Sequence, residues 1–116
     1  MIADLLPDNS ERRTNQKKQD IRVIISNPPY SGKQDSANDN AANIKYTNLD
    51  KKIASTYVSK STAKNKISLY DSYIRAFRWA TDRIKENGIV AFVSNASWIN
   101  GRAMDGLRQD LVQNFN

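Results

Sequence analysis

Two short runs of apolar, β-branched residues constrain the fold of this chain most strongly. The first is IRVIIS (residues 21–26), in which four of six residues are Ile or Val, and the second is IVAFVS (residues 89–94). Near-continuous apolar runs are typical of strands that are covered on both faces of a parallel sheet. Because parallel strands need a long crossover, usually a helix, we expect an α/β fold in which the two strands are joined by a right-handed βαβ connection.

The segment between these runs carries the clearest helical pattern. In SLYDSYIRAFRWATDRIKENG (residues 68–88), apolar side chains recur every three or four residues: Tyr70, Tyr73, Ile74, Phe77, Ala80 and Ile84. Ser68 is the expected helix cap, with Asp71 three residues later, and Gly88 is the expected stop. A further helix is predicted over residues 103–116, with Gly106 as a mild defect in it.

The rest of the chain has weaker patterns. Residues 1–20 are a polar N-terminal segment, and residues 31–67 form a long basic insert, in which a short helix is predicted to begin at Asn48. A connection of this length inside a compact domain is usually functional or disordered. The expected organisation is therefore the polar segment, a strand with the tetrapeptide that follows it (21–30), the insert (31–67), and a helix–strand–helix unit (68–116).

The composition of the 116 residues excludes several classes of protein. The chain has no Cys and no His, so disulfides, Ser-His-Asp triads and Cys-His pairs are ruled out, and we expect no metal site. No apolar run approaches the length of a membrane span, and the N-terminus lacks the order of a signal peptide, so we expect no membrane partner and a cytoplasmic location. The net charge of +6 favours a polyanionic partner.

The tetrapeptide Asn27-Pro28-Pro29-Tyr30 follows the first strand, where open α/β sheets bind ligands. The two prolines fix the backbone, so that the carbonyls of Asn27 and Pro28 point in set directions. The Asn27 side chain adds a further acceptor, and Tyr30 offers a flat ring for stacking. Rigid acceptors beside an aromatic ring suit a planar molecule with an amino group, such as a flipped-out adenine. The alternative is an ordinary turn followed by a tyrosine that packs in the core.

Two further features are candidates for DNA contact. Between residues 45 and 66 the insert carries six lysines and one aspartate, a net charge of +5: Lys45, Lys51, Lys52, Lys60, Lys64 and Lys66. These lysines are predicted to contact DNA phosphates near the target base, the alternative being a solvated loop and helix face. Trp98 lies in the loop after the second strand, at the same end of the sheet as Asn27.

A family resemblance extends this interpretation. IRVIISNPPYSG resembles motif IV of the amino-methyltransferases that use S-adenosylmethionine, and Asn-Pro-Pro-Tyr is the form typical of enzymes that modify N6 of adenine. Over nearly the whole chain, the sequence is similar to the methyltransferase region of type ISP restriction-modification enzymes. The stretches that carry this similarity are NSERRTNQKKQDIRVIISNPPYS, KYTNLDKKIASTYV, SLYDSYIRAFRWATDRI and GIVAFVSNASWINGRAMDGLR.

The resemblance implies a fold, a partner, a cofactor and roles for the tetrapeptide. The fold would be part of a Rossmann-like methyltransferase domain, with the strands at Ile21 and Ile89 as its fourth and fifth. DNA would be the partner and S-adenosylmethionine the cofactor. Asn27 and the Pro28 carbonyl would hold the adenine amine, with Pro29 in the same rigid motif, and Tyr30 would stack on the base. In the family the loop that carries Trp98 lies beside the pocket, so Trp98 would line the base site, the alternative being that it packs in the core.

One departure from the family pattern bears on activity. The family binds S-adenosylmethionine mainly through a glycine-rich turn and an acidic residue upstream of the tetrapeptide, whereas the twenty residues before Ile21 contain no glycine. The resemblance therefore implies a fragment that lacks most of the cofactor site and does not methylate alone. Its cofactor-binding residues stay unassigned, and the remainder of the parent polypeptide is its expected partner.

Three alternatives stay open. The same tetrapeptide occurs in methyltransferases that act on protein glutamine, so the chain could belong to one of those. It could also be a non-catalytic remnant that only binds DNA or only folds. Finally, the strand at Ile21 would expose an apolar edge, which favours pairing with a second copy in a homo-oligomer.

Overall fold

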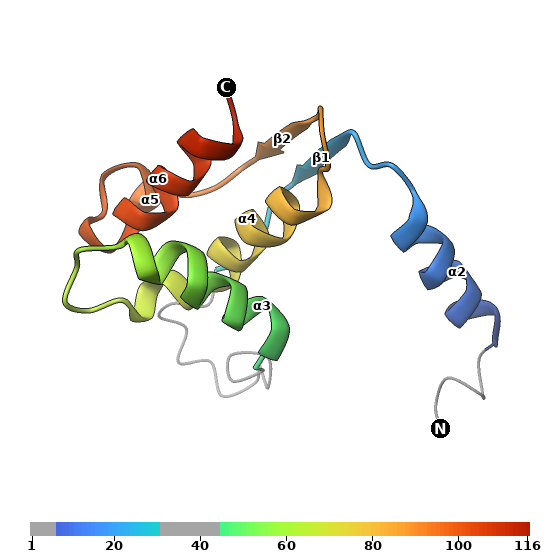
Figure 1. Cartoon of the computed structure of the whole chain (residues 1–116), viewed down its shortest axis with the longest axis horizontal. Coiled ribbons are helices and arrows are strands. Elements are labelled where there is room, and N and C mark those ends of the chain that lie inside the picture. The colour runs from blue at the N-terminus through green and yellow to red at the C-terminus, as the bar shows by residue number, and fades with distance from the viewer. Residues whose placement is uncertain (1–6, 31–44) are drawn as a thin grey trace.

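The computed structural model describes residues 7–30 and 45–116, and these form a small mixed α/β unit (Figure 1). In chain order its elements are α2 (Pro7–Lys18), β1 (Val23–Ser26), α3 (Thr47–Ile53), the π-helical stretch η1 (Ala54–Val58), the 3-10 turn η2 (Ile67–Tyr70), α4 (Ser72–Arg83), β2 (Ile89–Phe92), α5 (Ser97–Asn100), the 3-10 turn η3 (Arg102–Met104) and α6 (Asp105–Asn114).

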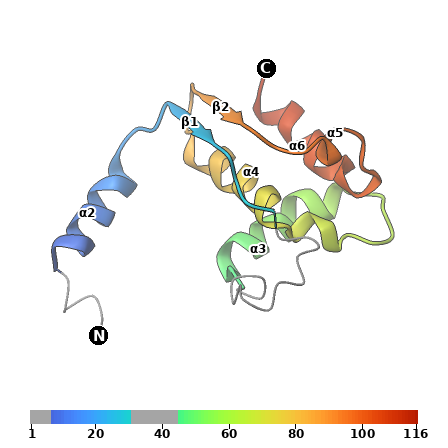
Figure 2. The ribbon, with the colours of Figure 1, turned by 180° about the vertical axis from the view of Figure 1, so that it is seen from behind.

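Strands β1 and β2 form a parallel two-stranded sheet, as the two apolar runs predict. Their register runs from Val23 opposite Ile89 to Ser26 opposite Phe92. Helix α4 connects the strands and lies along one face of the sheet, and the same arrangement is visible from behind (Figures 1 and 2). The expected strand–helix–strand unit is therefore confirmed.

The prediction that both strands are covered on both faces is wrong for this chain. Ile24 is buried, but its neighbours Val23 and Ile25 are 55% and 78% exposed, and Ile89 and Val93 are similarly open. The reason is that alternate strand residues face opposite sides, and among the described elements helices cover one side only. An apolar sheet face and the outer edge of β1 thus have no partner within residues 7–30 and 45–116.

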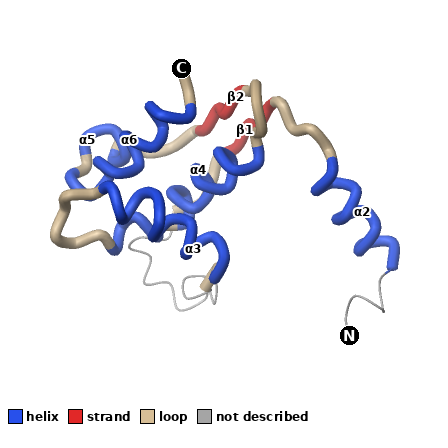
Figure 3. Tube along the Cα trace, viewed as in Figure 1, coloured by secondary structure: helices blue, strands red, loops and turns tan. Residues whose placement is uncertain are grey.

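The core lies between α4, the insert and the C-terminal helix. The α4 stripe is confirmed, since Tyr73, Ile74, Phe77 and Ala80 are all buried. The side chains that it packs against include Ile53, Tyr57, Leu69, Met104 and Leu107. Residues 31–44 of the insert lie outside the described residues, but the part after them forms α3 and η1, seen as one continuous helical tube in Figure 3. The insert is therefore a structural layer, and Ile53 and Tyr57 are fully buried in it.

Two of the predicted helix boundaries are wrong. Asp71, and not Ser68, caps α4: its carboxylate accepts a hydrogen bond from the backbone N–H of Tyr73 at 3.3 Å. Ser68 lies within the 3-10 turn that precedes this cap. Helix α4 also ends before Gly88, which instead passes close to the first strand, where an added Cβ would lie 2.5 Å from the carbonyl oxygen of Arg22.

Gly106 is a point of close contact and not a defect in its helix. A Cβ added there would lie 1.9 Å from the carbonyl oxygen of Tyr57, so that α6 rests directly on the backbone of η1. Glycine lowers helix propensity, but here it permits two helical segments to pack at a distance that no other residue allows.

Gly106→Ala should therefore destabilise the chain, although alanine is the better helix former. Overpacking of a tight contact typically costs 1–3 kcal/mol, and we expect a loss of about 2 kcal/mol in the free energy of unfolding. Urea denaturation followed by circular dichroism measures it. Val112→Ala, at an 80% exposed position of the same helix, is the control and should change stability by less than about 0.5 kcal/mol. A Gly106→Ala variant as stable as the parent would contradict the contact.

Helix α2 stands apart from this core (Figures 1 and 2). It is polar on all sides, and the residues from Glu11 to Lys18 are exposed. Its carboxyl end is held by Arg83 of α4, whose guanidinium donates to the backbone carbonyls of Gln16 and Gln19. None of the helices in the described ranges is long and apolar enough to cross a membrane.

Candidate functional site

The tetrapeptide Asn27–Tyr30 begins at the carboxyl end of β1. The last hydrogen bond of the sheet runs from the backbone N–H of Val93 to the carbonyl of Ser26 at 3.0 Å, and the chain leaves the sheet immediately afterwards. Pro28 is buried, whereas Asn27 is exposed and Tyr30 is 39% exposed. The buried proline anchors the segment, and the residues on either side of it remain accessible.

The polar groups of this segment are free to accept hydrogen bonds from a ligand. Neither the Asn27 side chain nor the backbone carbonyls of Asn27 and Pro28 have a hydrogen-bond partner among the residues that the structure describes. Pro28 and Pro29 have no backbone N–H, so neither of them can donate a hydrogen bond to these acceptors. The acceptors and the Tyr30 ring thus lie within four residues of one another on a backbone of restricted freedom.

Tyr30 is the first member of a cluster of aromatic rings that contact one another. The Tyr30 ring meets the Tyr73 ring with 5.4 Å between centroids and 66° between planes, an edge-to-face contact. Tyr73 meets Phe77 at 6.4 Å, and Phe77 meets both Phe92 at 5.1 Å and Trp98 at 5.3 Å. Because Phe92 is the last residue of β2 and Tyr73 lies in the first turn of α4, the cluster joins the tetrapeptide to both of these elements.

Trp98 belongs to this cluster but reaches Tyr30 only through other rings. Its indole N–H donates to the Ser94 hydroxyl at 3.0 Å, and its ring is tilted against Phe77. Two rings separate it from Tyr30. The structure thus gives Trp98 a packing role near the carboxyl ends of the strands. A contact between Trp98 and the base stays a prediction.

Lys52 lies away from the strand end. Its ammonium pairs with Asp82 at 2.8 Å, in the last turn of α4, whereas Tyr73 lies in the first turn. Nine residues separate Asp82 from Tyr73, which is about 14 Å along an α-helix. Lys52 is thus engaged near the end of α4 that lies away from Tyr73.

Two other lysines of the insert are also engaged within the chain. Lys60 donates to the Asp110 carboxylate at 2.8 Å and to the Gln113 side-chain oxygen at 2.6 Å. Lys66 donates to the backbone carbonyl of Val58 at 3.0 Å. The Lys60 contacts join the insert to α6, and the Lys66 contact joins two parts of the insert. Both lysines thus have a structural role, whereas composition alone assigns their charges to DNA binding.

The remaining three lysines are exposed. Lys45, Lys51 and Lys64 have neither an ion pair nor a hydrogen bond from their side chains within residues 7–30 and 45–116. Of the six lysines proposed to contact phosphate, these three are the ones whose side chains pair with no other described residue.

The sequence interpretation missed a buried charge network around Arg78. This residue is 5% exposed, and its guanidinium donates to Asp110 at 2.7 Å and to Asp82 at 2.7 Å. It also lies 5.3 Å from the centre of the Tyr57 ring. Burial raises the pKa of the Tyr57 hydroxyl above its usual range, so the ring next to the guanidinium stays uncharged. The i, i+4 spacing of Arg78 and Asp82 was visible in the sequence, but the partner on α6 was not.

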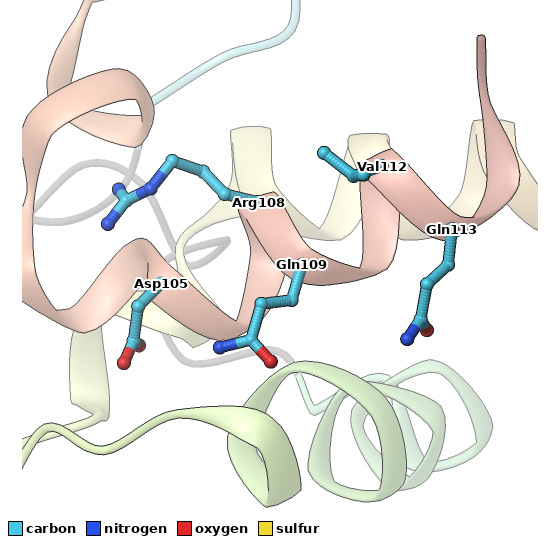
Figure 4. A pocket seen from close by; sticks show the side chains of 5 residues that line it. All are labelled: Asp105, Arg108, Gln109, Val112 and Gln113. Carbon is cyan, nitrogen blue, oxygen red and sulfur yellow. The ribbon is translucent and has the colours of Figure 1, made fainter.

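The pocket in Figure 4 does not present a second candidate site. It lies on α6 and is lined by Asp105, Arg108, Gln109, Val112 and Gln113. Arg108 already donates to the carbonyls of Trp98 and Gly101, and Asp105 accepts from the backbone and hydroxyl of Thr62. Its polar groups are thus satisfied internally. Within the described residues, no group of acidic side chains is placed to hold a metal ion.

Comparison with known proteins matches this chain to a family over residues 4–116, the Eco57I restriction-modification methylases. Three solved structures are also similar. A DrdV–DNA complex solved by cryo-EM shares 51% identity and a TM-score of 0.85, and the match covers 93% of this chain and 11% of that one. The type ISP restriction-modification enzyme LlaBIII bound to DNA shares 50% identity and a TM-score of 0.79, covering 89% and 7%.

The third structure is a nuclease-deletion mutant of the type ISP restriction-modification enzyme LlaGI with a DNA substrate mimic. It shares 44% identity and a TM-score of 0.86, and the match covers 95% of this chain and 10% of that one. The chain thus spans about a tenth of the length of these proteins. The sequence resemblance to type ISP enzymes is confirmed, and the chain belongs to the Eco57I restriction-modification methylase family.

Proposed function

We propose that this chain is the part of a restriction-modification DNA methyltransferase that holds the target adenine while its N6 is methylated from S-adenosylmethionine. One observation carries the proposal: Asn27–Tyr30 lies at the carboxyl end of a parallel strand, its acceptors have no partner among the described residues, and its aromatic ring is partly exposed. That is the place where ligands bind in open α/β sheets. The family match and the DNA complexes of the similar structures support DNA as the partner.

The residues present fit an adenine amine. The two N–H groups of the amine would donate to the Asn27 side-chain oxygen and to the Pro28 carbonyl, and the base would lie on the Tyr30 ring. Hydrogen bonds to a planar aromatic amine draw its lone pair out of the ring, which makes the nitrogen a better nucleophile. The contribution of this chain is thus to orient and polarise the amine, and such positioning is a major source of rate enhancement.

The residues present do not make a complete site for S-adenosylmethionine. Before Gly32 the chain has no glycine at all, and so no glycine-rich turn precedes the tetrapeptide. We therefore assign no cofactor-binding residue here and propose that the remainder of the parent polypeptide holds the cofactor. The methyl group is supplied from there.

The open sheet supports the same view of the fold. β1 and β2 would be the fourth and fifth strands of a Rossmann-like methyltransferase sheet, which continues in the parent polypeptide. The apolar side chains that have no cover among the described residues, Val23, Ile25, Ile89 and Val93, would be buried there. In the isolated chain, the free edge of β1 would instead favour pairing with a second copy.

The experiment that tests the function uses the complete polypeptide that contains this segment. It is incubated with methyl-labelled S-adenosylmethionine and either genomic DNA or a glutamine-containing protein, and the products are digested and identified by mass spectrometry. We expect N6-methyladenine. Methylglutamine would favour the protein-methyltransferase alternative, and no product from either substrate would favour a non-catalytic DNA-binding or folding role.

The isolated chain should neither bind S-adenosylmethionine in calorimetry nor methylate DNA. Methylation by the isolated chain would contradict the proposal that the cofactor site lies in the remainder of the parent polypeptide.

The exposed lysines give a second prediction about DNA. If Lys45, Lys51 and Lys64 contact phosphates, replacing all three with alanine in the complete polypeptide should reduce the slope of log affinity against log salt by about 2–3. Lys17, Lys18 and Lys85 are exposed lysines outside the insert and form the charge-matched control. An equal change in both variants, or none in the first, would show that the insert makes no phosphate contacts.

A further inference from the structure

We propose that Tyr73 is a positioning residue, which holds the ring of Tyr30 at the angle needed to stack on the target base. The inference rests on the proposed function, because it assigns to a second residue the orientation of a ring that the function requires. It is carried by the edge-to-face contact of the two rings, with 5.4 Å between their centroids and 66° between their planes.

The geometry of this contact suits a stacking platform. In an edge-to-face pair, the rings touch without lying parallel, so at least one face of Tyr30 is left uncovered by Tyr73. The 39% exposure of Tyr30 agrees with such an open face. Tyr73 can thus fix the Tyr30 ring while leaving it available.

Tyr73 is itself held firmly. It is 3% exposed, its ring is packed against Phe77, and its backbone N–H donates to the Asp71 carboxylate that caps α4. The first turn of a capped helix is a rigid support. Tyr30 itself follows two prolines on an irregular segment. Its ring orientation is therefore fixed by contact with α4, the helix that connects the two strands.

The contact works through the ring and not through the hydroxyl. Burial raises the pKa of Tyr73, and the neighbouring Asp71 and Tyr30 raise it further, so the phenol stays protonated and uncharged. A neutral edge-to-face contact stabilises a ring pair beyond the burial of its surface. Fixing the ring before the base arrives removes an entropic cost from the reacting complex. Loss of the ring should thus affect turnover, while loss of the hydroxyl alone should not.

The test compares Tyr73→Leu with Tyr73→Phe in the complete polypeptide, with DNA that carries the mapped methylation site as substrate. For Tyr73→Leu we expect kcat to fall by about 3- to 10-fold, as the energy of an aromatic contact implies, with KM for S-adenosylmethionine unchanged. For Tyr73→Phe we expect a kcat within 2-fold of the parent. If Tyr73→Leu does not fold, Tyr73→Met keeps more of the buried volume and is held to the same expectation.

Two further variants separate positioning from general damage. Leu107→Ala removes a fully buried side chain from the same core without touching Tyr30, and should destabilise the protein while leaving kcat unchanged. Tyr30→Ala should make the further change Tyr73→Leu nearly silent, because the ring to be positioned is gone. Three results would each overturn the inference. Leu107→Ala could lose as much kcat as Tyr73→Leu, Tyr73→Phe could be as slow as Tyr73→Leu, or the effects of Tyr30→Ala and Tyr73→Leu could be additive in the double variant.

These outcomes distinguish the inference from the proposed function. If Tyr30→Ala leaves adenine methylation unchanged, then the tetrapeptide does not hold the base and the proposed function fails. If Tyr30→Ala abolishes methylation and Tyr73→Leu does not change it, then the function stands and only the role of Tyr73 is lost.

Discussion

Asn27→Ala in the complete polypeptide should lower the rate of adenine methylation by about 10²- to 10³-fold, the range seen when one preorganised hydrogen-bond partner of a reacting group is removed. The Asn27 side chain is exposed at the end of β1 and has no partner among the described residues, so it is available to the substrate. Alanine leaves the backbone carbonyls in place but removes the acceptor that draws the lone pair of the adenine amine out of the ring and onto the nitrogen. The loss should appear in kcat, with KM for S-adenosylmethionine unchanged.

Two variants sharpen this prediction. Asn27→Asp keeps an acceptor oxygen at the same position, so we expect a smaller loss than for alanine. Asn87→Ala changes an exposed asparagine in the turn before β2, at the opposite end of the sheet, and should leave the rate unchanged. If adenine is methylated by the Asn27→Ala enzyme at the parent rate, then this side chain does not hold the amine, and the base must be recognised elsewhere.

The parts of the fold that could be predicted from sequence are those that depend on local patterns. Two apolar runs with a helical period between them define a strand–helix–strand unit, and the parallel pairing of β1 and β2 confirms it. The place of Asn27–Tyr30 at the strand end follows from the same reasoning, because its position is set by the strand before it. Helix boundaries depend on more than local patterns. Ser68 has the sequence of a cap, but it lies in a 3-10 turn that residue propensities do not predict, and Asp71 after that turn caps α4 instead.

Features that depend on distant contacts could not be predicted. Gly106 appeared as a weakness of its helix because the backbone of Tyr57, 49 residues earlier, is invisible to a local pattern. The lysines of the insert were counted as free positive charge, yet Lys52 and Lys60 pair with acids 30 and 50 residues away. A charge count cannot distinguish an ammonium that is paired inside the fold from one that is available to phosphate.

The same network supports the largest stability effect expected in this chain. Asp110→Asn should lower the free energy of unfolding by about 3–5 kcal/mol, the usual cost of breaking a buried ion pair by removing one partner. The Asp110 carboxylate is 3% exposed and accepts from Arg78 at 2.7 Å and from Lys60 at 2.8 Å. Asparagine keeps the shape but removes the charge. It leaves Lys60 without an acid partner among the described residues, and it leaves the buried Arg78 with Asp82 as its only described acid partner.

Urea denaturation of the chain measures this loss as a lower midpoint at an unchanged slope. Asp20→Asn is the matched control, because Asp20 pairs with Arg22 at 2.7 Å while both side chains are more than half exposed. Exposed pairs contribute about 0–1 kcal/mol, so this variant should unfold almost as the parent does. Equal effects in the two variants would mean that water reaches Asp110. The insert would then be only loosely joined to α6, and Lys60 would again be available to DNA.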